Sequence, residues 1–127
     1  MGIDQVTDGE LAVLEVIWKR GDPTSRDIAL AIYHEVTDSK TATVQKLLER
    51  LEAKGCVRRD RSERAHRFRA RISRDDFLQS RLQALADQVC EGSLAPLATT
   101  LLRSKELTPQ DRDALRKLVN DLWPPGE

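Results

Sequence analysis

Aromatic residues are scarce in this chain, and long apolar runs are absent. Only 4% of the 127 residues are aromatic, which argues against an RNA-binding surface built from stacked rings. No apolar run approaches the length of about 20 residues that a membrane-spanning helix needs, so no membrane insertion is expected. The N-terminus is acidic, lacks an apolar signal core and has Val6 where a myristoylation signal needs serine or threonine. These absences favour a cytoplasmic protein.

Cysteine and histidine are also few, and none of them forms a recognisable site pattern. Cys56 and Cys90 lie outside any pair with metal-ligand spacing, so we expect two buried, reduced thiols. His34 and His66 are separated, with no ligand or nucleophile near them in sequence. The chain contains no nucleophile elbow, phosphate loop or metal motif. We therefore expect a protein that is not an enzyme and holds no cofactor or metal.

The charge of the chain is concentrated in one segment, although the total is zero. Residues 40–74 carry 12 basic and 4 acidic side chains, a net charge of +8. Residues 1–39 carry 3 basic and 8 acidic side chains, and residues 75–127 carry 6 and 9, so both flanks are acidic. A concentrated basic segment beside a helix is typical of proteins that bind polyanions, and DNA is the expected polyanion.

Capping motifs and apolar periodicity predict two helices before this basic segment. Thr7 with Glu10, and Thr24 with Asp27, are start signals in which the threonine caps the helix and the acid lies three residues on. The apolar face of the second helix is expected to extend to Val36.

A third helix is expected from about Lys40 to Lys54, after a turn at residues 37–39 and with Gly55 as its C-terminal cap. At about 100° per residue its two faces differ in character. The apolar face consists of Val44, Leu47, Leu48 and Leu51. The opposite face, which is polar with two small residues, consists of Ala42, Gln45, Lys46, Glu49 and Ala53. That face can approach a binding partner closely.

Beyond the third helix the period changes to two, as in β-strands. Residues 56–61 predict one short strand, residues 62–64 a charged tip and residues 66–72 a second strand. In the second strand, apolar residues alternate with Arg67, Arg69 and Arg71, which predicts one buried face and one arginine face. We expect His66 to pack on the buried face.

Three more amphipathic helices are predicted after the ribbon, starting at Ser73, at about Leu94 and after the cap Thr108. Three helices followed by a ribbon predict a winged helix-turn-helix domain at residues 1–74, with its third helix in the major groove of DNA. The expected fold is mostly α with a small β-ribbon. Residues 75–127 are expected to form a helical dimerisation region, because their apolar stripes need a partner and a second copy is the simplest one.

Five motifs, in this order and with these gaps, are similar to those of one known family. They are residues 10–18 (ELAVLEVIW), 43–44 (TV), 48–55 (LERLEAKG), 64–68 (RAHRF) and 73–76 (SRDD). The chain resembles the penicillinase-repressor family (BlaI, MecI and CopY type) from about Thr7 to Leu122. This resemblance implies a dimeric bacterial transcriptional repressor that binds a palindromic operator in double-stranded DNA. It also implies derepression by proteolysis of the C-terminal region, triggered by a membrane-bound sensor protease.

The C-terminal region departs from two branches of that family. Where the β-lactam-responsive members have a cleaved Asn-Phe pair, this chain has Thr100 and Leu101 as its candidate cleavage site. We therefore expect a β-lactam-type sensor protease to cut this chain inefficiently. The copper-responsive members have a cysteine-rich tail that this chain lacks, so metal sensing is not expected.

Candidate DNA contacts lie on the third helix and around the ribbon tip, where side chains can meet base edges or phosphates. On the helix they are Thr41, Ala42, Thr43, Gln45, Lys46 and Arg50. On the ribbon they are Arg61, Arg64 and Arg67. The alternatives are a solvated helix face, charges that guard a ribbon edge and, for Arg50, an ion pair with a neighbouring helix. Candidate dimer contacts are Leu82, Leu85, Leu115, Leu118, Val119 and Leu122.

Two other functions are compatible with the same sequence. A winged helix can serve as a protein-interaction module, and a pocket between the helical arm and the winged domain would make a ligand-responsive regulator. The local charge of +8 favours DNA over a protein partner, and the few, scattered aromatic residues mark no such pocket.

Overall fold

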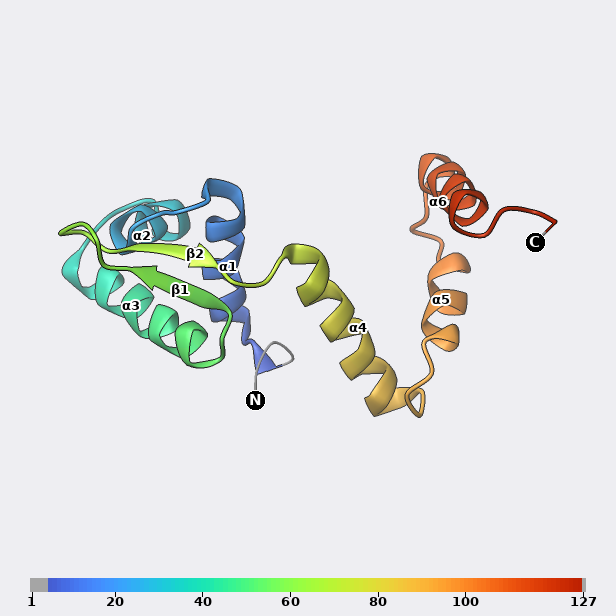
Figure 1. Cartoon of the computed structure of the whole chain (residues 1–127), viewed down its shortest axis with the longest axis horizontal. Helices are drawn as coiled ribbons and strands as arrows, with labels where there is room; N and C mark the ends of the chain where they lie inside the picture. Colours follow the sequence, from blue (N-terminus) through green and yellow to red (C-terminus); the bar gives the residue numbers. More distant parts are fainter. Residues whose placement is uncertain (1–4, 127) are drawn as a thin grey trace. The chain divides into compact units, whose positions relative to one another are not determined.

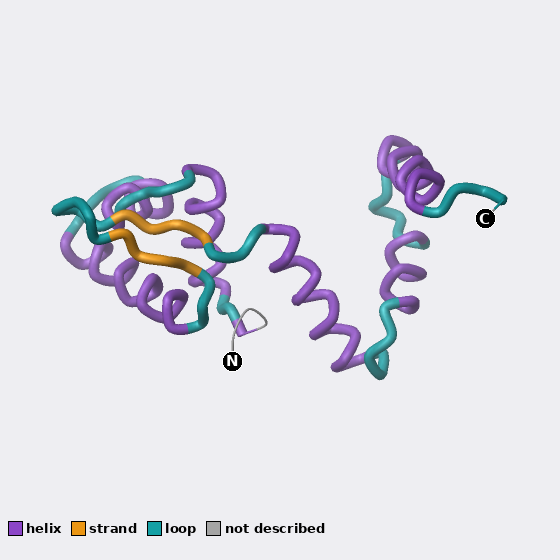
Figure 2. Tube along the Cα trace, viewed as in Figure 1, coloured by secondary structure: helices purple, strands orange, loops and turns teal. Residues whose placement is uncertain are grey.

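The computed structural model describes residues 5–126, and these residues form eight helices and strands (Figure 1). In chain order they are α1 (Asp8–Arg20), α2 (Ser25–Tyr33), α3 (Asp38–Ala53), β1 (Val57–Asp60), β2 (Arg67–Ala70), α4 (Arg74–Val89), α5 (Ala95–Leu102) and α6 (Pro109–Leu122). The predicted fold class is confirmed: the chain is mostly helical, and a two-stranded antiparallel ribbon follows three helices as in a winged helix-turn-helix (Figure 2). Two compact units are present, one through Ala84 and one from Leu85 onward.

The predicted capping motifs start the first two helices. The Thr7 hydroxyl accepts from the Glu10 amide at 3.3 Å, and the Glu10 carboxylate accepts from the Thr7 amide at 2.9 Å. Thr24 and Asp27 form the same pair of bonds, at 3.1 and 3.0 Å. Because each box satisfies two amides that helical bonding leaves free, the sequence alone determines where both helices begin.

The third helix begins earlier than predicted, so the expected turn at residues 37–39 was wrong. Thr37 is the N-cap of α3, and its hydroxyl accepts from the Lys40 amide at 3.1 Å. The chain turns instead after His34, which ends α2 in the left-handed conformation at φ 62°. Val36 therefore lies beyond α2 and is exposed rather than on its apolar face. The error arose because threonine, aspartate and serine favour both turns and helix starts.

The ribbon is shorter than the predicted strands but has the expected alternation. Val57 pairs with Ala70 and Asp60 with Arg67 at its two ends. In β2 the Phe68 side chain is buried, whereas the next side chain, Arg69, is exposed. Gly55 ends the preceding helix at φ 78°, a conformation that glycine adopts without strain. The tip-side half of the ribbon is also bound to the loop before α2, because the Phe68 amide donates to the Pro23 carbonyl at 3.0 Å.

The core of the first unit lies between α1, α2, α3 and the ribbon. Its fully buried large side chains come from all four parts, and they are Leu14, Ile17, Ile28, Leu48, Leu51 and Val57. Cys56 is buried in this core as expected, but Cys90 is only half-buried, and both are free thiols. This packing holds α3 and the ribbon against the same support.

A buried ion pair joins the start of α1 to the end of α3. The Lys54 ammonium lies 2.9 Å from one Glu10 carboxylate oxygen and donates to the Gln5 carbonyl at 2.8 Å. The Glu10 side chain is fully buried, whereas 17% of the Lys54 side chain is exposed. Burial raises the pKa of Glu10, but the hydrogen bonds from Lys54 and Thr7 outweigh it, so this pKa lies below its ordinary value.

The first half of α4 packs against α1 within the first unit. The rings of Trp18 and Phe77 lie 5.7 Å apart, and the Trp18 indole donates to the Ile72 carbonyl at 3.0 Å. Arg74 pairs with Glu15 at 2.6 Å and lies over the Trp18 ring. These contacts fix the direction in which the chain leaves the ribbon.

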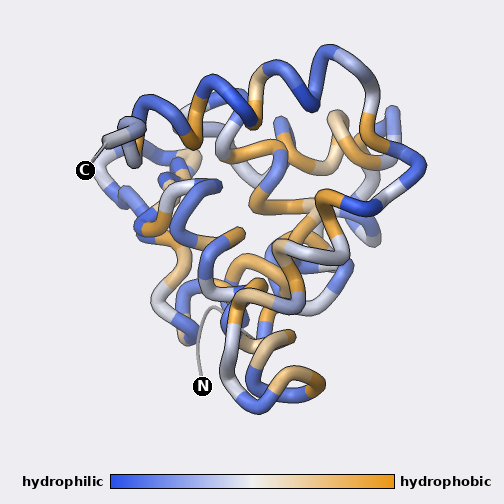
Figure 3. The backbone as a smooth tube through the Cα atoms, turned by 90° about the vertical axis from the view of Figure 1, so that its right-hand side faces the viewer, coloured by the Kyte–Doolittle hydropathy of each residue, from blue (hydrophilic) through white to orange (hydrophobic). Residues whose placement is uncertain are grey.

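The second unit consists of the end of α4 with α5 and α6, and it leaves much apolar surface exposed. Along α6, which leads to the C-terminus, hydrophobic and hydrophilic residues alternate (Figure 3). Leu118 is 51% exposed and Leu122 is 59% exposed. Within residues 5–126, no helix is long and apolar enough to cross a membrane.

Candidate nucleic-acid interface

One face of α3 is exposed. Val44, Leu48 and Leu51 are buried on the inner face, as predicted. The exposed residues on the other side are Ala42, Thr43, Gln45, Lys46, Glu49 and Arg50. In Figure 1 the start of α3 and the ribbon tip lie at the same end of the unit. The face that can meet base edges and the tip that can meet phosphates are therefore neighbours.

The candidate residues on α3 differ in how much of their bonding capacity is free. The Thr43 hydroxyl donates to the Ser39 carbonyl at 3.1 Å, which leaves its methyl group for contact with a partner. Thr41 is half-buried. Within residues 5–126, neither Gln45 nor Lys46 forms a side-chain hydrogen bond or ion pair with the protein. Gln45 and Lys46, like the exposed Arg50 on the same face, can therefore donate to bases without first breaking an internal bond.

Arg50 is exposed, and within the described chain it has no ion pair with a neighbouring helix. The alternative in which Arg50 forms an ion pair with a neighbouring helix therefore has no support within residues 5–126. Lys40, at the start of the same helix, pairs with Glu35 and lies 5.6 Å from the centre of the Tyr33 ring.

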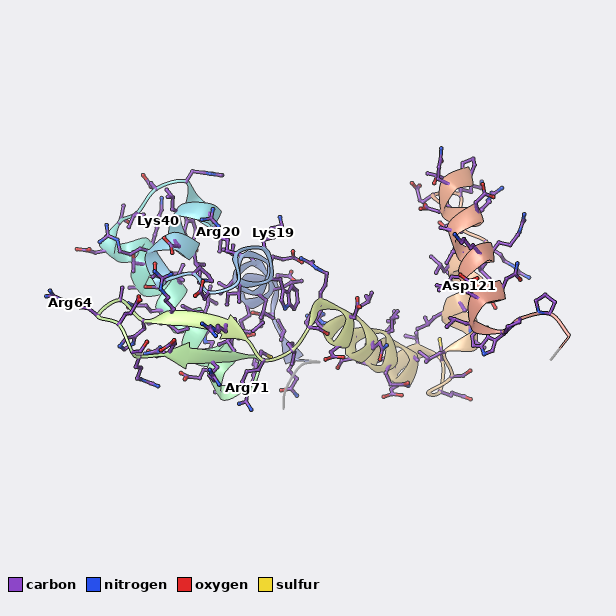
Figure 4. All side chains as sticks on the ribbon, turned by 45° about the horizontal axis from the view of Figure 1, so that its top comes forward. Lys19, Arg20, Lys40, Arg64, Arg71 and Asp121 are labelled. Atoms are coloured by element: carbon purple, nitrogen blue, oxygen red, sulfur yellow. The ribbon has the colours of Figure 1, made fainter. Side chains whose placement is uncertain are left out.

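The arginines around the ribbon tip fall into two kinds. Arg64 is exposed, and its side chain extends away from the strands (Figure 4). Arg61 is 61% exposed, with its nearest acid, Glu52, 4.0 Å away. Arg67 is half-buried and pairs with Glu63 at 2.9 Å while also donating to the Asp22 carbonyl at 3.1 Å. Arg67 thus lies at the tip end of β2, where it joins the ribbon to the loop before α2.

A cleft of about 470 Å³ lies between the start of α2, α3 and the ribbon. The residues that α2 and its cap contribute are Thr24, Ser25 and Arg26. Those from α3 are Thr41, Gln45 and Glu49. Those from the ribbon and its tip are Arg59, Arg64, Ala65, His66 and Phe68. The predicted contacts Thr41, Gln45 and Arg64 are therefore brought together around one depression, and Lys46 lies beside it on α3.

Sequence reasoning missed several residues of this cleft. Ser25 and Arg26 follow the cap Thr24, which was identified as a helix start but not as part of a binding surface. His66 was expected to pack on the buried face with Phe68, but it is only half-buried and lines the cleft. The strand begins only at Arg67, so the alternation does not determine the direction of the His66 side chain.

Comparison with known proteins agrees with this arrangement. The profile of the family described as Penicillinase repressor matches residues 6–121. The chain is 23% identical to the penicillinase repressor of Bacillus licheniformis over 119 residues, which cover 94% of this chain and 92% of that protein. It is 22% identical over 116 residues to an uncharacterized 16.5 kDa protein in the ptsI 3' region of Latilactobacillus sakei, covering 91% and 79% of the two chains. The family consists of DNA-binding regulators rather than enzymes, as the sequence predicted. The chain belongs to the penicillinase repressor family of transcriptional repressors.

Proposed function

We propose that this repressor binds a two-fold symmetric operator as a homodimer in the cytoplasm. The observation that carries the proposal is the open face of α3 beside an exposed ribbon tip, within a segment of net charge +8. Gln45 and Lys46 contact base edges in the major groove, and Arg64 contacts the phosphate backbone. Thr41, Ala42, Thr43, Arg50 and Arg61 complete the contact surface. Arg67 acts mainly by holding the ribbon in position, because its Nε and one Nη are already bonded to Glu63 and to the Asp22 carbonyl.

The dimer is proposed from the apolar surface that residues 75–127 leave open. The six candidate contact residues are Leu82, Leu85, Leu115, Leu118, Val119 and Leu122; all except Leu115, which is half-buried, are exposed. Apolar stripes of this extent on successive helices are typical of surfaces covered by a partner. A second copy supplies the same stripes and also provides the second recognition helix that a symmetric operator needs.

Derepression is proposed to follow loss of the dimer. The candidate cleavage site, Thr100 and Leu101, lies within α5, and both residues are exposed. A protease must bind its substrate in an extended form, so α5 has to open locally before a membrane-bound sensor protease can cut there. A chain that loses the dimer contacts keeps a single winged unit and loses the avidity of two.

DNA binding is tested by selecting duplexes from a random pool with the purified protein and comparing them with random duplex in competition. Recovered sites are expected to be two-fold symmetric. Gln45→Ala and Lys46→Ala should each lose about 1–3 kcal/mol of discrimination, whereas Arg64→Ala should weaken all duplexes alike and reduce the salt dependence. Equal affinity for selected and random duplex would refute specific repression, and no affinity for either would favour a protein-interaction module.

The dimer is tested by sedimentation of the wild-type chain and of Leu118→Asp at micromolar concentration. Leu118→Asp places a charge in the proposed interface and should favour monomers. Lys117→Asp is the matched control, because at about 100° per residue it lies on the side of α6 away from the apolar stripe. A monomeric wild-type mass, or equal dissociation of both variants, would exclude this interface.

A further inference from the structure

The cleft beside α3 contains a charged cluster with a titratable member. Arg26 enters from α2, Glu49 from α3, Arg59 from β1 and Arg64 from the ribbon tip. His66 lies among them and is half-buried. With neutral His66 the cluster carries three positive charges and one negative charge, and protonation adds a fourth positive charge. Glu63 and Arg67, which flank the cluster, are paired with each other at 2.9 Å.

One donor at the cleft has no acceptor within the described chain. The Nε of Arg59 is buried and forms no hydrogen bond among residues 5–126. The guanidinium of Arg59 lies 5.0 Å from the centre of the Phe68 ring, and the same Nε is 4.0 Å from a Glu52 carboxylate oxygen, too far for a hydrogen bond. A buried donor without an acceptor is unfavourable. An anionic ligand in this cleft would supply acceptor oxygens to the arginines that surround it.

We propose that the cleft binds one phosphate group of the DNA backbone and that protonation of His66 strengthens this contact, so DNA affinity rises as the pH falls. The inference rests on the proposed function and adds a regulation to the same surface. Histidine is the side chain whose ordinary titration falls between about pH 5 and 8. A protonated imidazole donates a charge-assisted hydrogen bond to a phosphate oxygen, which a neutral imidazole cannot match.

The other titratable groups with shifted pKa values in the first unit do not change charge in that range. Backbone hydrogen bonds from Thr24 and Ser62 lower the pKa values of Asp27 and Asp60, away from neutral pH. Burial raises the pKa of the Cys56 thiol. The sequence contains two histidines, and the second, His34, lies at the end of α2 and does not line the cleft. His34 therefore provides the internal control.

The test measures binding of the full chain to a random-sequence duplex of about 30 base pairs, or three helical turns, by fluorescence anisotropy at constant ionic strength and two pH values. Between about pH 8 and pH 6 the wild type is expected to gain about three- to tenfold in affinity per bound chain. His66→Gln should bind at both pH values as the wild type binds at pH 8. His66→Lys, which carries a permanent charge, should bind at both pH values as tightly as the wild type at pH 6. His34→Asn, which tolerates the left-handed conformation, should keep the wild-type response.

Equal DNA affinity of His66→Gln and the wild type at pH 8 would show that the variant is folded. Its weaker binding at pH 6 would then result from the missing charge. A pH response that persists in His66→Gln, or that disappears in His34→Asn, would overturn the inference. Wild-type binding with no pH response would also overturn it while leaving the proposed function intact. Failure of the wild type to bind duplex at either pH would instead contradict DNA binding itself.

Discussion

Replacing Lys54 with methionine is expected to destabilise the first unit much more than replacing Glu10 with glutamine. The two residues form one ion pair, but their surroundings differ: Glu10 is fully buried and Lys54 is 17% exposed at its side chain. Lys54→Met leaves a buried carboxylate without its cation. Glu10→Gln leaves an ammonium that still reaches solvent and the Gln5 carbonyl. The more deeply buried charge is the more costly one to leave unpaired.

The expected losses in free energy of unfolding follow from this difference in burial. Removing one partner of a buried ion pair costs about 3–5 kcal/mol when the remaining charge is inaccessible to water, which is the case for Lys54→Met. Glu10→Gln keeps the shape of the side chain and loses one charged acceptor, so we expect about 1–2 kcal/mol. Domains of this size have a free energy of unfolding of about 5–15 kcal/mol, so both changes are measurable.

The stability of the wild type and that of Lys54→Met should also respond to acid in opposite directions. In the wild type the folded pKa of Glu10 is lowered, so its stabilising effect is present above the unfolded carboxyl pKa of about 4.3 and is lost as the pH falls through the folded value. In Lys54→Met burial dominates and raises the folded pKa above the unfolded one. That variant should therefore gain stability as the pH falls from neutral toward about 4.3, by up to about 1.4 kcal/mol per pH unit.

Urea unfolding followed by tryptophan fluorescence, at one protein concentration and at about pH 7 and pH 5, measures both effects. Lys40→Met is the matched control, because Lys40 pairs with an exposed glutamate, Glu35, and exposed pairs contribute less than about 1 kcal/mol. If Lys54→Met costs no more than Glu10→Gln, or becomes less stable toward pH 5, the reasoning from burial is wrong.

Three other substitutions test separate features of the fold. Leu48→Ala removes a fully buried side chain and should cost about 2–5 kcal/mol in urea unfolding, whereas a cost below about 1 kcal/mol would contradict the packed core. Gly55→Ala places a Cβ in open space at φ 78°, so it should cost about 1 kcal/mol and lower Tm by a few degrees; an unchanged Tm would show that the strain is absent. Trp18→Phe removes the donor to the Ile72 carbonyl and should cost about 1 kcal/mol, and equal urea midpoints would mean that this bond contributes nothing.

The parts of the fold that the sequence predicted well depend on local bonding. The capping boxes at Thr7 and Thr24 use groups three residues apart, so their sequence determines their geometry. The same holds for Thr108 and Asp111 at the start of α6. Val36 was misplaced because an exposed apolar residue just beyond a helix has the same spacing as one on its inner face.

The features that the sequence did not predict depend on contacts between distant residues. Lys54 and Glu10 are 44 positions apart, and Arg67 and Asp22 are 45 apart. The pairing of Arg67 with Glu63 is local, but its bond to the Asp22 carbonyl is not, so sequence reasoning assigned Arg67 the same role as Arg64. The cleft was missed for the same reason, because α2, α3 and the ribbon tip meet only in the folded unit.

The main-chain bonds between the ribbon and the loop before α2 bear on how operator specificity can change during evolution. The Phe68 amide donates to the Pro23 carbonyl, and an isolated β-bridge joins Thr24 to Arg67. Any residue other than proline can supply the amide at position 68. The position of the ribbon relative to the start of α2 is therefore maintained by main-chain groups that mutation rarely removes. If Gln45 and Lys46 contact bases as proposed, substitutions there would change the target sequence while the ribbon keeps its position, so related repressors could diverge in operator without a change of fold.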